Sequence, residues 1–310
     1  MAHSPPLVTI GLPVHNGMPY LPVTVESLLN QTYRNFELVI SDNASDDGSS
    51  EYCREVAGRD SRVRVVRIET KVGAAVNYNR LVELASGKYF KWAAADDVCV
   101  PDFVGRCFEA LEQTPEAVVS HPQFDCIGPD GESVDYYHEP DHVRHNGLAR
   151  RFRGNLRGVH VDVIIFGLIR TDILRQTRLF RYVPDTDRIL LAELALRGTI
   201  VEVPEKLFFR RLHAKQSWAM HPSRAQHASW IHPQARGKVC PMWSIFREYL
   251  SVVAEAPVGL SAKGACLFEL AGWAGRNAGQ MTSEIQVACK RFAGRLMTGR
   301  GRNPEWKRVS

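Results

Sequence analysis

The stretch of sequence that decides the fold is Tyr89-Phe90-Lys91-Trp92-Ala93-Ala94-Ala95-Asp96-Asp97. Its apolar residues predict a buried strand, and two adjacent carboxylates follow at the carboxyl end of that strand. Neighbouring carboxylates repel each other unless a cation or a water-filled cleft receives them. Oxygen ligands at the rim of an α/β sheet suit Mg²⁺ or Mn²⁺, which keep several waters and bind substrate phosphates. A solvated turn with a helix N-cap is the alternative for such an acidic pair.

Residues 1–120 alternate predicted strands with predicted helices. This order predicts a parallel sheet, whose ligands bind beyond the carboxyl ends of the strands. Asp42 and the Asp96-Asp97 pair follow the second and the fourth strand, so we expect them at the same edge of the sheet. The expected strands are 7–13, 36–41, 63–68 and 88–95, and the expected helices are 20–31, 73–86 and 101–113.

The second half of the chain has a different pattern. Residues 121–157 are expected to be irregular, because they are rich in His, Asp, Gly and Arg. A helix is expected at 187–197, with Gly198 as its stop. After about residue 218 the spacing of apolar residues predicts amphipathic helices. The remaining expected elements are strands at 199–203 and 206–213 and helices at 243–253, 261–277 and 283–297.

The composition is that of an ordinary globular protein, since 45% of the 310 residues are hydrophobic and 24% are charged. The formal net charge of +5 permits anionic substrates or an acidic membrane surface. Nucleic-acid binding is not expected, because the basic residues are not gathered with aromatic residues into one stripe. The seven cysteines form no C-x-x-C pair, which favours reduced thiols in the cytosol over disulfides or a zinc site.

The order of short motifs between residues 7 and 105 resembles glycosyltransferase family 2, the inverting transferases with the GT-A fold. Each motif alone is weak, but the set in this order is specific. The motifs are Leu12 to Gly17, Ser27 to Tyr33, Phe36 to Gly48, the residues Gly73, Asn77 and Asn79, and Ala85 to Phe90.

The resemblance implies an α/β fold, with the Rossmann-like and mostly parallel sheet of the nucleotide-diphospho-sugar transferases. The GT-A domain would cover residues 1–217, and its nucleotide-binding half would be 1–120. The acceptor-binding half would be 121–217, and an α-helical C-terminal extension would follow at 218–310.

The resemblance also implies which residues bind the nucleotide. The segment after the first strand lines the base and the ribose, and Asp42 accepts the imide N–H of the base. The chemistry agrees, because a carboxylate is only an acceptor and can read a donor on a pyrimidine or guanine edge. The alternative for Asp42 is a helix or turn cap. The nucleotide-binding residues expected in this way are Pro13, Val14, Asn16, Asp42, Asn79 and Asp96.

The metal motif of the family is often Asp-x-Asp-Asp, and here Ala94 stands in place of the first Asp. This difference leaves open which carboxylate contacts the metal. Asp97 is the favoured ligand for Mn²⁺ or Mg²⁺, with Asp96 directed toward the ribose or a metal-bound water. His213, in a segment that resembles the Arg-x-His of the family, is expected to complete the metal shell or to contact the diphosphate. A structural hydrogen bond is the alternative for this histidine.

A second resemblance, from Val183 to Gly198, implies the general base. Members of the family often have Glu-Asp followed by an amphipathic helix that ends in Gly. Counting back from Gly198 places Asp187 on the motif Asp, and Thr186 stands where Glu is usual. Asp185 is therefore a rival for the same role. Either aspartate is also suited to cap the helix.

Four residues are expected near the diphosphate or the acceptor. Arginine can bind phosphate oxygens in a bidentate way, and glycine lets a sugar approach the backbone closely. A plain strand turn is the alternative for the glycine-containing segment at 166–170. The four residues are Arg210, Arg211, Gly167 and Trp92.

Together these features predict a metal-dependent inverting glycosyltransferase. A sugar would move from a UDP-, GDP- or dTDP-linked donor to a hydroxyl of a glycan, a lipid or a small molecule. A non-catalytic nucleotide-sugar-binding protein is one alternative, because Ala94 and Thr186 depart from the family pattern. A sugar nucleotidyltransferase is the other, but its phosphate loop needs several Gly and basic residues. The segment 13–19 has one Gly and no Lys or Arg.

The expected location is the cytoplasm. The N-terminus shows no basic region followed by an apolar stretch, and no apolar run approaches 18 residues. A peripheral contact with the inner face of the membrane is a secondary expectation. It rests on the basic C-terminal helix, which places Phe292, Leu296 and Met297 on one face.

Overall fold

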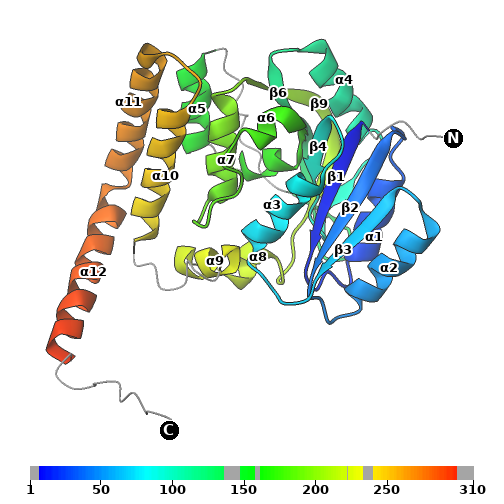
Figure 1. Cartoon of the computed structure of the whole chain (residues 1–310), viewed down its shortest axis with the longest axis horizontal. Helices are drawn as coiled ribbons and strands as arrows, with labels where there is room; N and C mark the ends of the chain where they lie inside the picture. The colour runs from blue at the N-terminus through cyan, green and yellow to red at the C-terminus, as the bar shows by residue number, and fades with distance from the viewer. Residues whose placement is uncertain (1–6, 136–146, 158–160, 222, 233–239, 299–310) are drawn as a thin grey trace, which may run out of the picture.

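The computed structural model describes residues 7–135, 147–157, 161–221, 223–232 and 240–298. These residues form a central mixed sheet with helices on both faces and a group of helices at one end (Figure 1). The strands are β1 (Val8–Val14), β2 (Phe36–Asn43), β3 (Val63–Ile68), β4 (Tyr89–Trp92), β5 (Val98–Cys99), β6 (Ala117–Ile127), β7 (Ser133–Val134), β8 (Leu168–Arg170) and β9 (Thr199–Arg211).

Helices connect these strands and also form the C-terminal part of the described chain. A short 3₁₀ helix, η1 (Val161–Phe166), precedes β8. The α-helices are α1 (Leu21–Leu29), α2 (Ser49–Arg59), α3 (Ala74–Leu84), α4 (Phe103–Gln113), α5 (Leu148–Arg157), α6 (Thr171–Arg175), α7 (Thr186–Ala195), α8 (Ser217–Met220), α9 (Arg224–Ile231), α10 (Pro241–Glu255), α11 (Leu260–Arg276) and α12 (Ala278–Thr298).

The sheet has the strand order β3-β2-β1-β4-β8-β6-β9-β5. β1 pairs in parallel with β2 and β4, and β2 pairs in parallel with β3. β8 is antiparallel to both of its neighbours, β4 and β6, while β6 and β9 are parallel. The parallel register sets Val14 opposite Asp42 and Asp42 opposite Arg67. The first half of the chain therefore has the parallel α/β arrangement that the sequence predicts.

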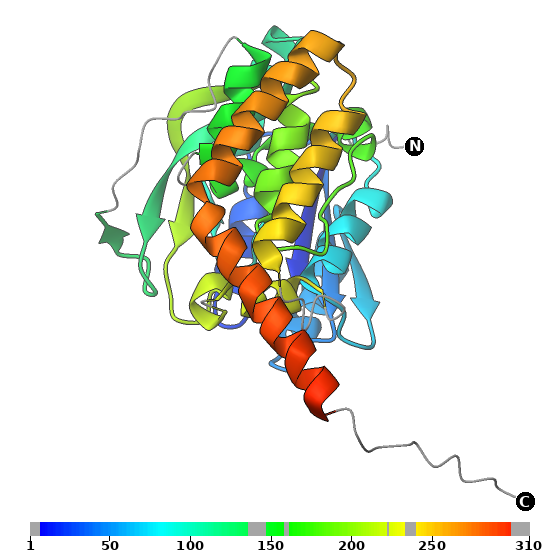
Figure 2. The ribbon, with the colours of Figure 1, turned by 90° about the vertical axis from the view of Figure 1, so that its left-hand side faces the viewer.

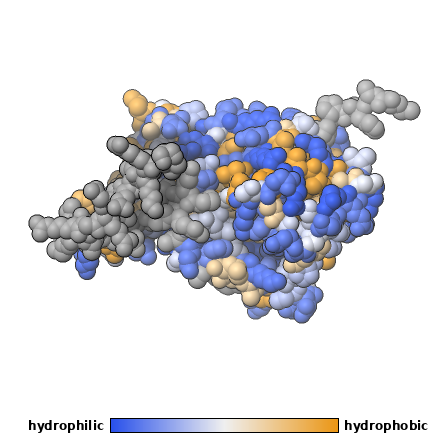
Figure 3. Space-filling model, turned by 60° about the horizontal axis from the view of Figure 1, so that its bottom comes forward, coloured by the Kyte–Doolittle hydropathy of each residue, from blue (hydrophilic) through white to orange (hydrophobic). Residues whose placement is uncertain are grey.

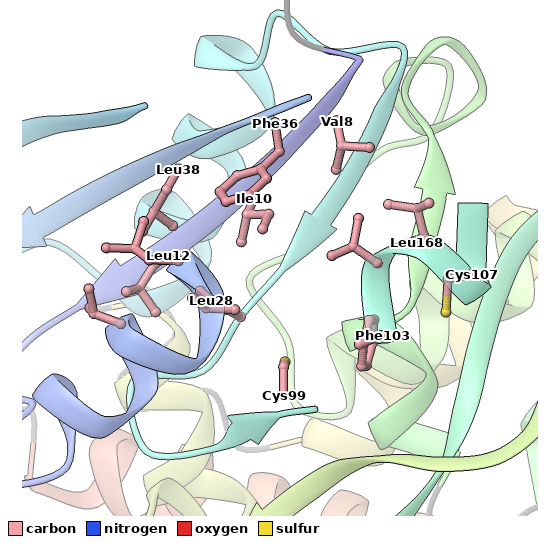
Figure 4. Close-up of a cluster of buried hydrophobic side chains, with 14 of the residues drawn as sticks. Val8, Ile10, Leu12, Leu28, Phe36, Leu38, Cys99, Phe103, Cys107 and Leu168 are labelled. Atoms are coloured by element: carbon pink, nitrogen blue, oxygen red, sulfur yellow. The ribbon is translucent and has the colours of Figure 1, made fainter. Parts of the chain in front are cut away.

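Apolar clusters cover both faces of the sheet. Val8, Ile10 and Leu12 alternate along β1 and face the same side, where they pack with residues of α1 and α4 (Figure 4). On the opposite face, Phe90 and Trp92 belong to a cluster that includes residues of α3 and α7. Because helices cover both faces, the central strands carry nearly continuous apolar runs.

A third apolar cluster joins the C-terminal helices to α5 and α7. It combines Phe152 of α5 and Ile189 of α7 with Ile245 and Tyr249 of α10 and Leu270 of α11. Figure 2 shows α10 and α11 lying along one side of the molecule, with α12 continuing beyond the body. The helices after residue 218 thus share a core with the half of the chain that precedes them, instead of packing around a core of their own.

Three expected elements differ from the structure. Strand β4 ends at Trp92, so the Asp96-Asp97 pair lies in the turn that follows and not at the strand end itself. Within 121–157, which was expected to be irregular, β6 continues to Ile127 and α5 begins at Leu148. The two strands expected between 199 and 213 form the single strand β9.

The paired strands β6 and β9 are hard to predict from the sequence, because their alternation of apolar and polar residues is interrupted. Pro122 lies within β6 and Pro204 within β9, and proline removes a donor from a ladder of hydrogen bonds. The pairing accommodates this with register shifts, one of which falls between Pro122 and Gln123. A β-bulge of this kind interrupts the regular alternation by which a strand is recognised.

Lys91 of β4 is a fully buried cation in the sheet. Its Nζ donates hydrogen bonds to the carbonyl oxygens of Trp92 (3.1 Å) and Phe166 (2.7 Å). The ammonium also lies 4.0 Å from the centre of the Phe103 ring. Its charge partly offsets the rise in the pKa of Asp97 that burial causes. Asp96 and Asp97, in the turn after β4, are called the acidic turn below.

We expect Lys91→Met to destabilise the fold by about 2–4 kcal/mol, because two buried carbonyls lose a donor. Urea unfolding followed by circular dichroism measures this change. Lys88→Met is the matched control, since the Lys88 side chain is 56% exposed and its contacts with Glu112 and the Tyr89 ring lie at the surface. A Lys91→Met variant as stable as wild type would show that the free-energy cost of burying the ammonium equals the stabilisation from its hydrogen bonds.

Candidate active site

The turn after β4 separates the roles of its two carboxylates. Asp97 points into the protein and is 7% exposed. Its Oδ1 accepts a hydrogen bond from the backbone N–H of Arg211 (2.9 Å), and its own carbonyl accepts one from Thr24 Oγ1 (2.8 Å). Burial, together with the charge of Asp96, raises the pKa of Asp97 to about 8. Asp97 therefore joins the turn to β9 and α1.

Asp96 is the more accessible carboxylate of the pair. Its side chain is 28% exposed, and Oδ2 lies 2.9 Å from Nε2 of His213. Nδ1 of His213 accepts the backbone N–H of Lys215 (3.3 Å), so in the neutral ring Nε2 carries the proton and donates it to Asp96. The expectation that Asp97 is the direct metal ligand conflicts with this geometry, which brings Asp96 and His213 together and turns Asp97 inward.

Arg211 fastens the acidic turn. Its Nε donates to the carbonyl of Asp96 (2.9 Å), and Nη1 donates to the carbonyls of Gly128 and Pro129 (both 3.0 Å). The guanidinium lies over the Tyr20 ring, 4.8 Å from its centre, and the residue is 5% exposed. The side chain of Arg211 is thus buried and engaged with backbone carbonyls, and its expected contact with the diphosphate stays a prediction.

Arg210 remains a candidate for the diphosphate. It precedes Arg211 in β9, and successive side chains of a strand point to opposite faces. Its charge lowers the pKa of Asp97, so the guanidinium lies on the side of the acidic turn. No contact of Arg210 tests the expected role.

Tyr78 of α3 connects the acidic turn with α7. Burial raises the pKa of its phenol, and the charges of Asp96, Asp97 and Asp187 raise it further. The charges of three carboxylates from distant parts of the sequence therefore act on one phenol. The sequence prediction missed Tyr78, even though it stands between the motif residues Asn77 and Asn79.

The two candidate bases have different surroundings. Asp185 is the N-cap of α7 with a φ of 54°, and its Oδ2 lies 3.6 Å from Nε of Arg224. Asp187 lies in the first turn of the helix, where its Oδ1 accepts the backbone N–H of Arg188 (2.8 Å). Asp187 acts on Tyr78 together with the acidic turn, while Asp185 is paired with α9. Thr186 Oγ1 accepts the backbone N–H of Arg181 (2.5 Å).

Asp42 and Arg67 form a pair at the carboxyl edge of the parallel strands. Asp42 is fully buried, and its Oδ2 lies 2.5 Å from Nη1 of Arg67. Its Oδ1 accepts the backbone N–H of Ser45 (3.0 Å). The Arg67 side chain is 36% exposed and presents the accessible side of the pair. Arg67 was missed because only the strand register sets it opposite Asp42.

The loop after β1 is tied to the loop after β2. Asn16 has a φ of 54°, its Nδ2 donates to Asp46 Oδ1 (2.8 Å), and its Oδ1 accepts the N–H of Asp46 (3.0 Å). Pro13 and Val14 are buried in β1 beside Asp42. Nearby, burial and the Lys71 ammonium lower the pKa of His15. The expected nucleotide residues thus lie at one edge of the sheet, with the Asn16 amide already engaged by Asp46.

Three expected contact residues are structural. Trp92 is fully buried and its Nε1 donates to the carbonyl of Tyr78 (3.1 Å), so it has no surface for a substrate. Gly167 packs against the backbone of β6, where an added Cβ would overlap the carbonyl oxygen of Ser120. Asn79 uses both ends of its amide on the backbone of Phe180 (3.0 Å each). These contacts give Trp92, Gly167 and Asn79 a structural part, and their expected roles at the substrate stay predictions.

The described residues contain no group of three or more His, Cys, Asp and Glu side chains that could hold a metal by themselves. Asp96 and His213 supply two donors. Mg²⁺ and Mn²⁺ sites of substrate-phosphate type use one or two protein ligands and complete their shell with phosphates and water. The donor pair therefore suits a metal that arrives with a nucleotide diphosphate.

The fold is an α/β fold whose acidic turn follows β4, and α/β sheets of this kind bind ligands beyond the carboxyl edge of their parallel strands. Figure 3 turns the molecule so that its bottom in Figure 1 comes forward, and the coloured part of this face is hydrophilic with apolar areas among the polar residues. A family model described as glycosyl transferase family 2 matches residues 9–178. The chain belongs to this family.

Comparisons with individual proteins agree with this assignment. Glycosyltransferase GlyG of Streptococcus pneumoniae is 31% identical over 130 residues, which are 42% of this chain and 43% of GlyG. The chain thus spans less than half the length of this curated relative.

Two solved structures show the same fold. The S. aureus TarS 1–349 structure with UDP-GlcNAc has a TM-score of 0.65 at 15% identity, covering 86% of this chain and 72% of TarS. The mannosyltransferase PcManGT from Pyrobaculum calidifontis, in complex with GDP-Man and Mn²⁺, has a TM-score of 0.52 at 16% identity, covering 96% of this chain and 88% of PcManGT. The expected GT-A fold is confirmed.

Proposed function

We propose that this chain transfers a sugar from a nucleoside diphosphate to a hydroxyl acceptor, with inversion at the anomeric carbon. The observation that carries the proposal is the pair of Asp96 and His213, 2.9 Å apart, in the turn after β4. The charges of Asp187, Asp96 and Asp97 all act on the Tyr78 phenol, which supports a role for Asp187 in the same site. In a single displacement the metal-binding carboxylate lies near the departing diphosphate, and the basic carboxylate lies on the opposite side of the anomeric carbon, where the acceptor hydroxyl attacks. Asp187 would remove the proton of the acceptor hydroxyl as the hydroxyl attacks the anomeric carbon and the nucleotide departs.

The pair of Asp42 and Arg67 supports selection of the base. An arginine donor beside a carboxylate acceptor is complementary to an N–H next to a carbonyl oxygen. Uracil, thymine and guanine present that pattern, whereas adenine and cytosine do not. The proposal therefore names UDP-, dTDP- or GDP-linked sugars as donors. TarS with UDP-GlcNAc and PcManGT with GDP-Man are neighbours of the same fold that bind donors of this kind.

We expect Arg67→Met to raise the KM for the donor by about tenfold, because one hydrogen bond to a charged donor contributes about 1.5–3 kcal/mol. Initial rates at varied donor concentration measure this change. Arg64→Met is the matched control, since Arg64 lies in the same strand with a side chain 44% exposed and pairs with Glu37, away from Asp42. An unchanged donor KM in Arg67→Met would remove the base-reading role.

Asp96 and His213 are the proposed protein ligands of Mn²⁺ or Mg²⁺. Their facing atoms lie 2.9 Å apart, at hydrogen-bond distance, and a divalent cation would bind between them in place of that hydrogen bond. The cation would neutralise charge that develops on the departing diphosphate. Arg210 is the proposed additional contact to the phosphates.

Release of the nucleoside diphosphate tests the proposed function. The protein is incubated with UDP-, GDP- and dTDP-sugars and Mn²⁺, with and without a panel of hydroxyl acceptors. Release that depends on both donor and acceptor supports transfer. Tight donor binding without release in any combination would favour a non-catalytic nucleotide-sugar-binding protein.

Helix α12 supports a peripheral membrane contact as a second proposal. Ile285 (46%), Val287 (41%) and Phe292 (66%) are exposed, and Lys290 lies on the same helix. The described part of the chain has no helix with the length and apolar character needed to cross a bilayer.

We expect the protein to sediment with anionic phospholipid vesicles, and Phe292→Glu to reduce the bound fraction several-fold. Gln286→Glu, an equal change of charge at an exposed polar site, is the control, and equal loss in both variants would contradict apolar insertion.

A further inference from the structure

The loop that leads into Asp187 is held in a strained shape. It joins α6 to α7 and contains two residues with positive φ that are not glycine, Leu179 (52°) and Asp185 (54°). Such conformations cost on the order of 1–3 kcal/mol each and persist only where surrounding contacts impose them. One such contact is Asn79 of α3, which clamps both backbone polar groups of Phe180. The position of Asp187 therefore depends on what holds this loop.

The C-terminal helix α10 holds the loop from outside. Glu248 is 6% exposed, and its Oε2 lies 3.2 Å from Nη1 of Arg178 and 3.3 Å from Nε of Arg181. Nη2 of Arg178 also donates to the carbonyl of Glu248 (3.0 Å). Both arginines belong to the loop, so one buried carboxylate of α10 binds the loop at two points.

Arg178 extends the connection into α7. Its backbone N–H donates to Oε2 of Glu193 (3.2 Å), and the Glu193 side chain is 3% exposed. Arg197 pairs with the other oxygen of Glu193 at 3.2 Å. α7 carries Asp187 in its first turn and Glu193 in its body, so Arg178 joins α10 to the helix of the proposed base. Buried pairs of this kind are costly to break, because removal of one partner leaves an uncompensated charge.

We infer that Glu248 of the C-terminal helices is a positioning residue for Asp187, acting through Arg178. The inference rests on the proposed function, because it assigns to Glu248 the placement of the proposed base. The family model ends at residue 178, and Glu248 lies well beyond it. The C-terminal helices then contribute to turnover as well as to folding.

Glu248→Gln tests the inference. The expected result is a fall in kcat of about tenfold or more, since small displacements of a catalytic group have effects of up to 10². The donor KM and the Kd for the free nucleotide should stay within twofold of wild type, because the proposed nucleotide residues lie at the ends of β1, β2 and β3 and not on α7 or α10. Rates are normalised to the concentration of nucleotide-binding sites, so that a merely less stable protein keeps its kcat per folded molecule.

Glu255→Gln is the matched control. Glu255 lies on the same helix and 3.7 Å from the same Arg178, but its side chain is 57% exposed. Its kcat should remain that of wild type. Equal losses in Glu255→Gln and Glu248→Gln, or a normal kcat in Glu248→Gln, would overturn the inference.

A double-mutant cycle tests the route through Arg178. Once Arg178→Gln is present, adding Glu248→Gln should lower kcat no further, and fully additive losses would overturn the route. If Glu248→Gln does not fold, Arg178→Lys replaces it, because lysine keeps the charge but cannot make both contacts of the guanidinium with Glu248. A normal kcat in that variant would count against the inference. Full activity of Asp187→Asn would instead overturn the proposed base, which separates the two failures.

Discussion

Replacing Asp187 with asparagine should reduce turnover by roughly 10²-fold or more while leaving nucleotide affinity near wild type. Asparagine keeps the shape of the side chain but cannot accept the proton of an acceptor hydroxyl. The charges of Asp96, Asp97 and Asp187 all act on one phenol, that of Tyr78, which connects Asp187 electrostatically with the acidic turn. Stopped assays of nucleoside diphosphate release give kcat, and calorimetry with the free nucleotide gives Kd.

Asp185→Asn is the control for this result, because Asp185 is two residues away and is paired with Arg224 at 3.6 Å. Its loss should affect the attachment of α9 more than turnover. A dead Asp185→Asn variant beside an active Asp187→Asn variant would exchange the two roles. Loss of nucleotide binding in Asp187→Asn would show instead that the substitution disturbs the whole site.

Nucleotide binding should depend on a divalent cation through Asp96 and His213. In calorimetric titrations with UDP or GDP, Mn²⁺ should strengthen binding to the wild type by at least about tenfold, which is 1.4 kcal/mol. Asp96→Asn should abolish this gain, since it removes the charge that faces His213. His213→Gln should reduce it, and excess chelator should reproduce the Asp96→Asn affinity in the wild type.

Asp97→Asn distinguishes this arrangement from the one that the sequence favoured. An asparagine oxygen can still accept the backbone N–H of Arg211, so the turn should keep its shape and the metal dependence should survive. The change should appear mainly in the free energy of unfolding. Metal dependence that vanishes in Asp97→Asn and persists in Asp96→Asn would restore Asp97 as the ligand.

The sequence predicts the parallel half of this fold well for a physical reason. A central parallel strand is covered on both faces, so its residues form a short apolar run that is easily recognised between polar loops. Strands β6 and β9 are harder, because Pro122 and Pro204 and the shifted register break that pattern. Chain order also reveals that Asp42 and the Asp96-Asp97 pair share an edge, since parallel strands align their carboxyl ends.

What the sequence could not predict is the direction in which each side chain points. Trp92 is four residues before Asp96, yet the strand buries it completely. Asp96 and Asp97 are adjacent, yet one faces His213 and the other faces the backbone of β9. Arg67 and Tyr78 join the site through strand register and helix packing, which depend on contacts between distant segments.

The core that α7 shares with α10 and α11 limits how this protein can be recombined with its relatives. Ile189 of α7 packs in one cluster with Ile245, Tyr249 and Leu270 of the C-terminal helices. A chimera that exchanged only the segment after residue 218 would set a foreign apolar surface against α5 and α7, whose side chains had adapted to another partner. Exchange of acceptor preference between members would therefore require α5, α7 and the C-terminal helices to be transplanted as one unit.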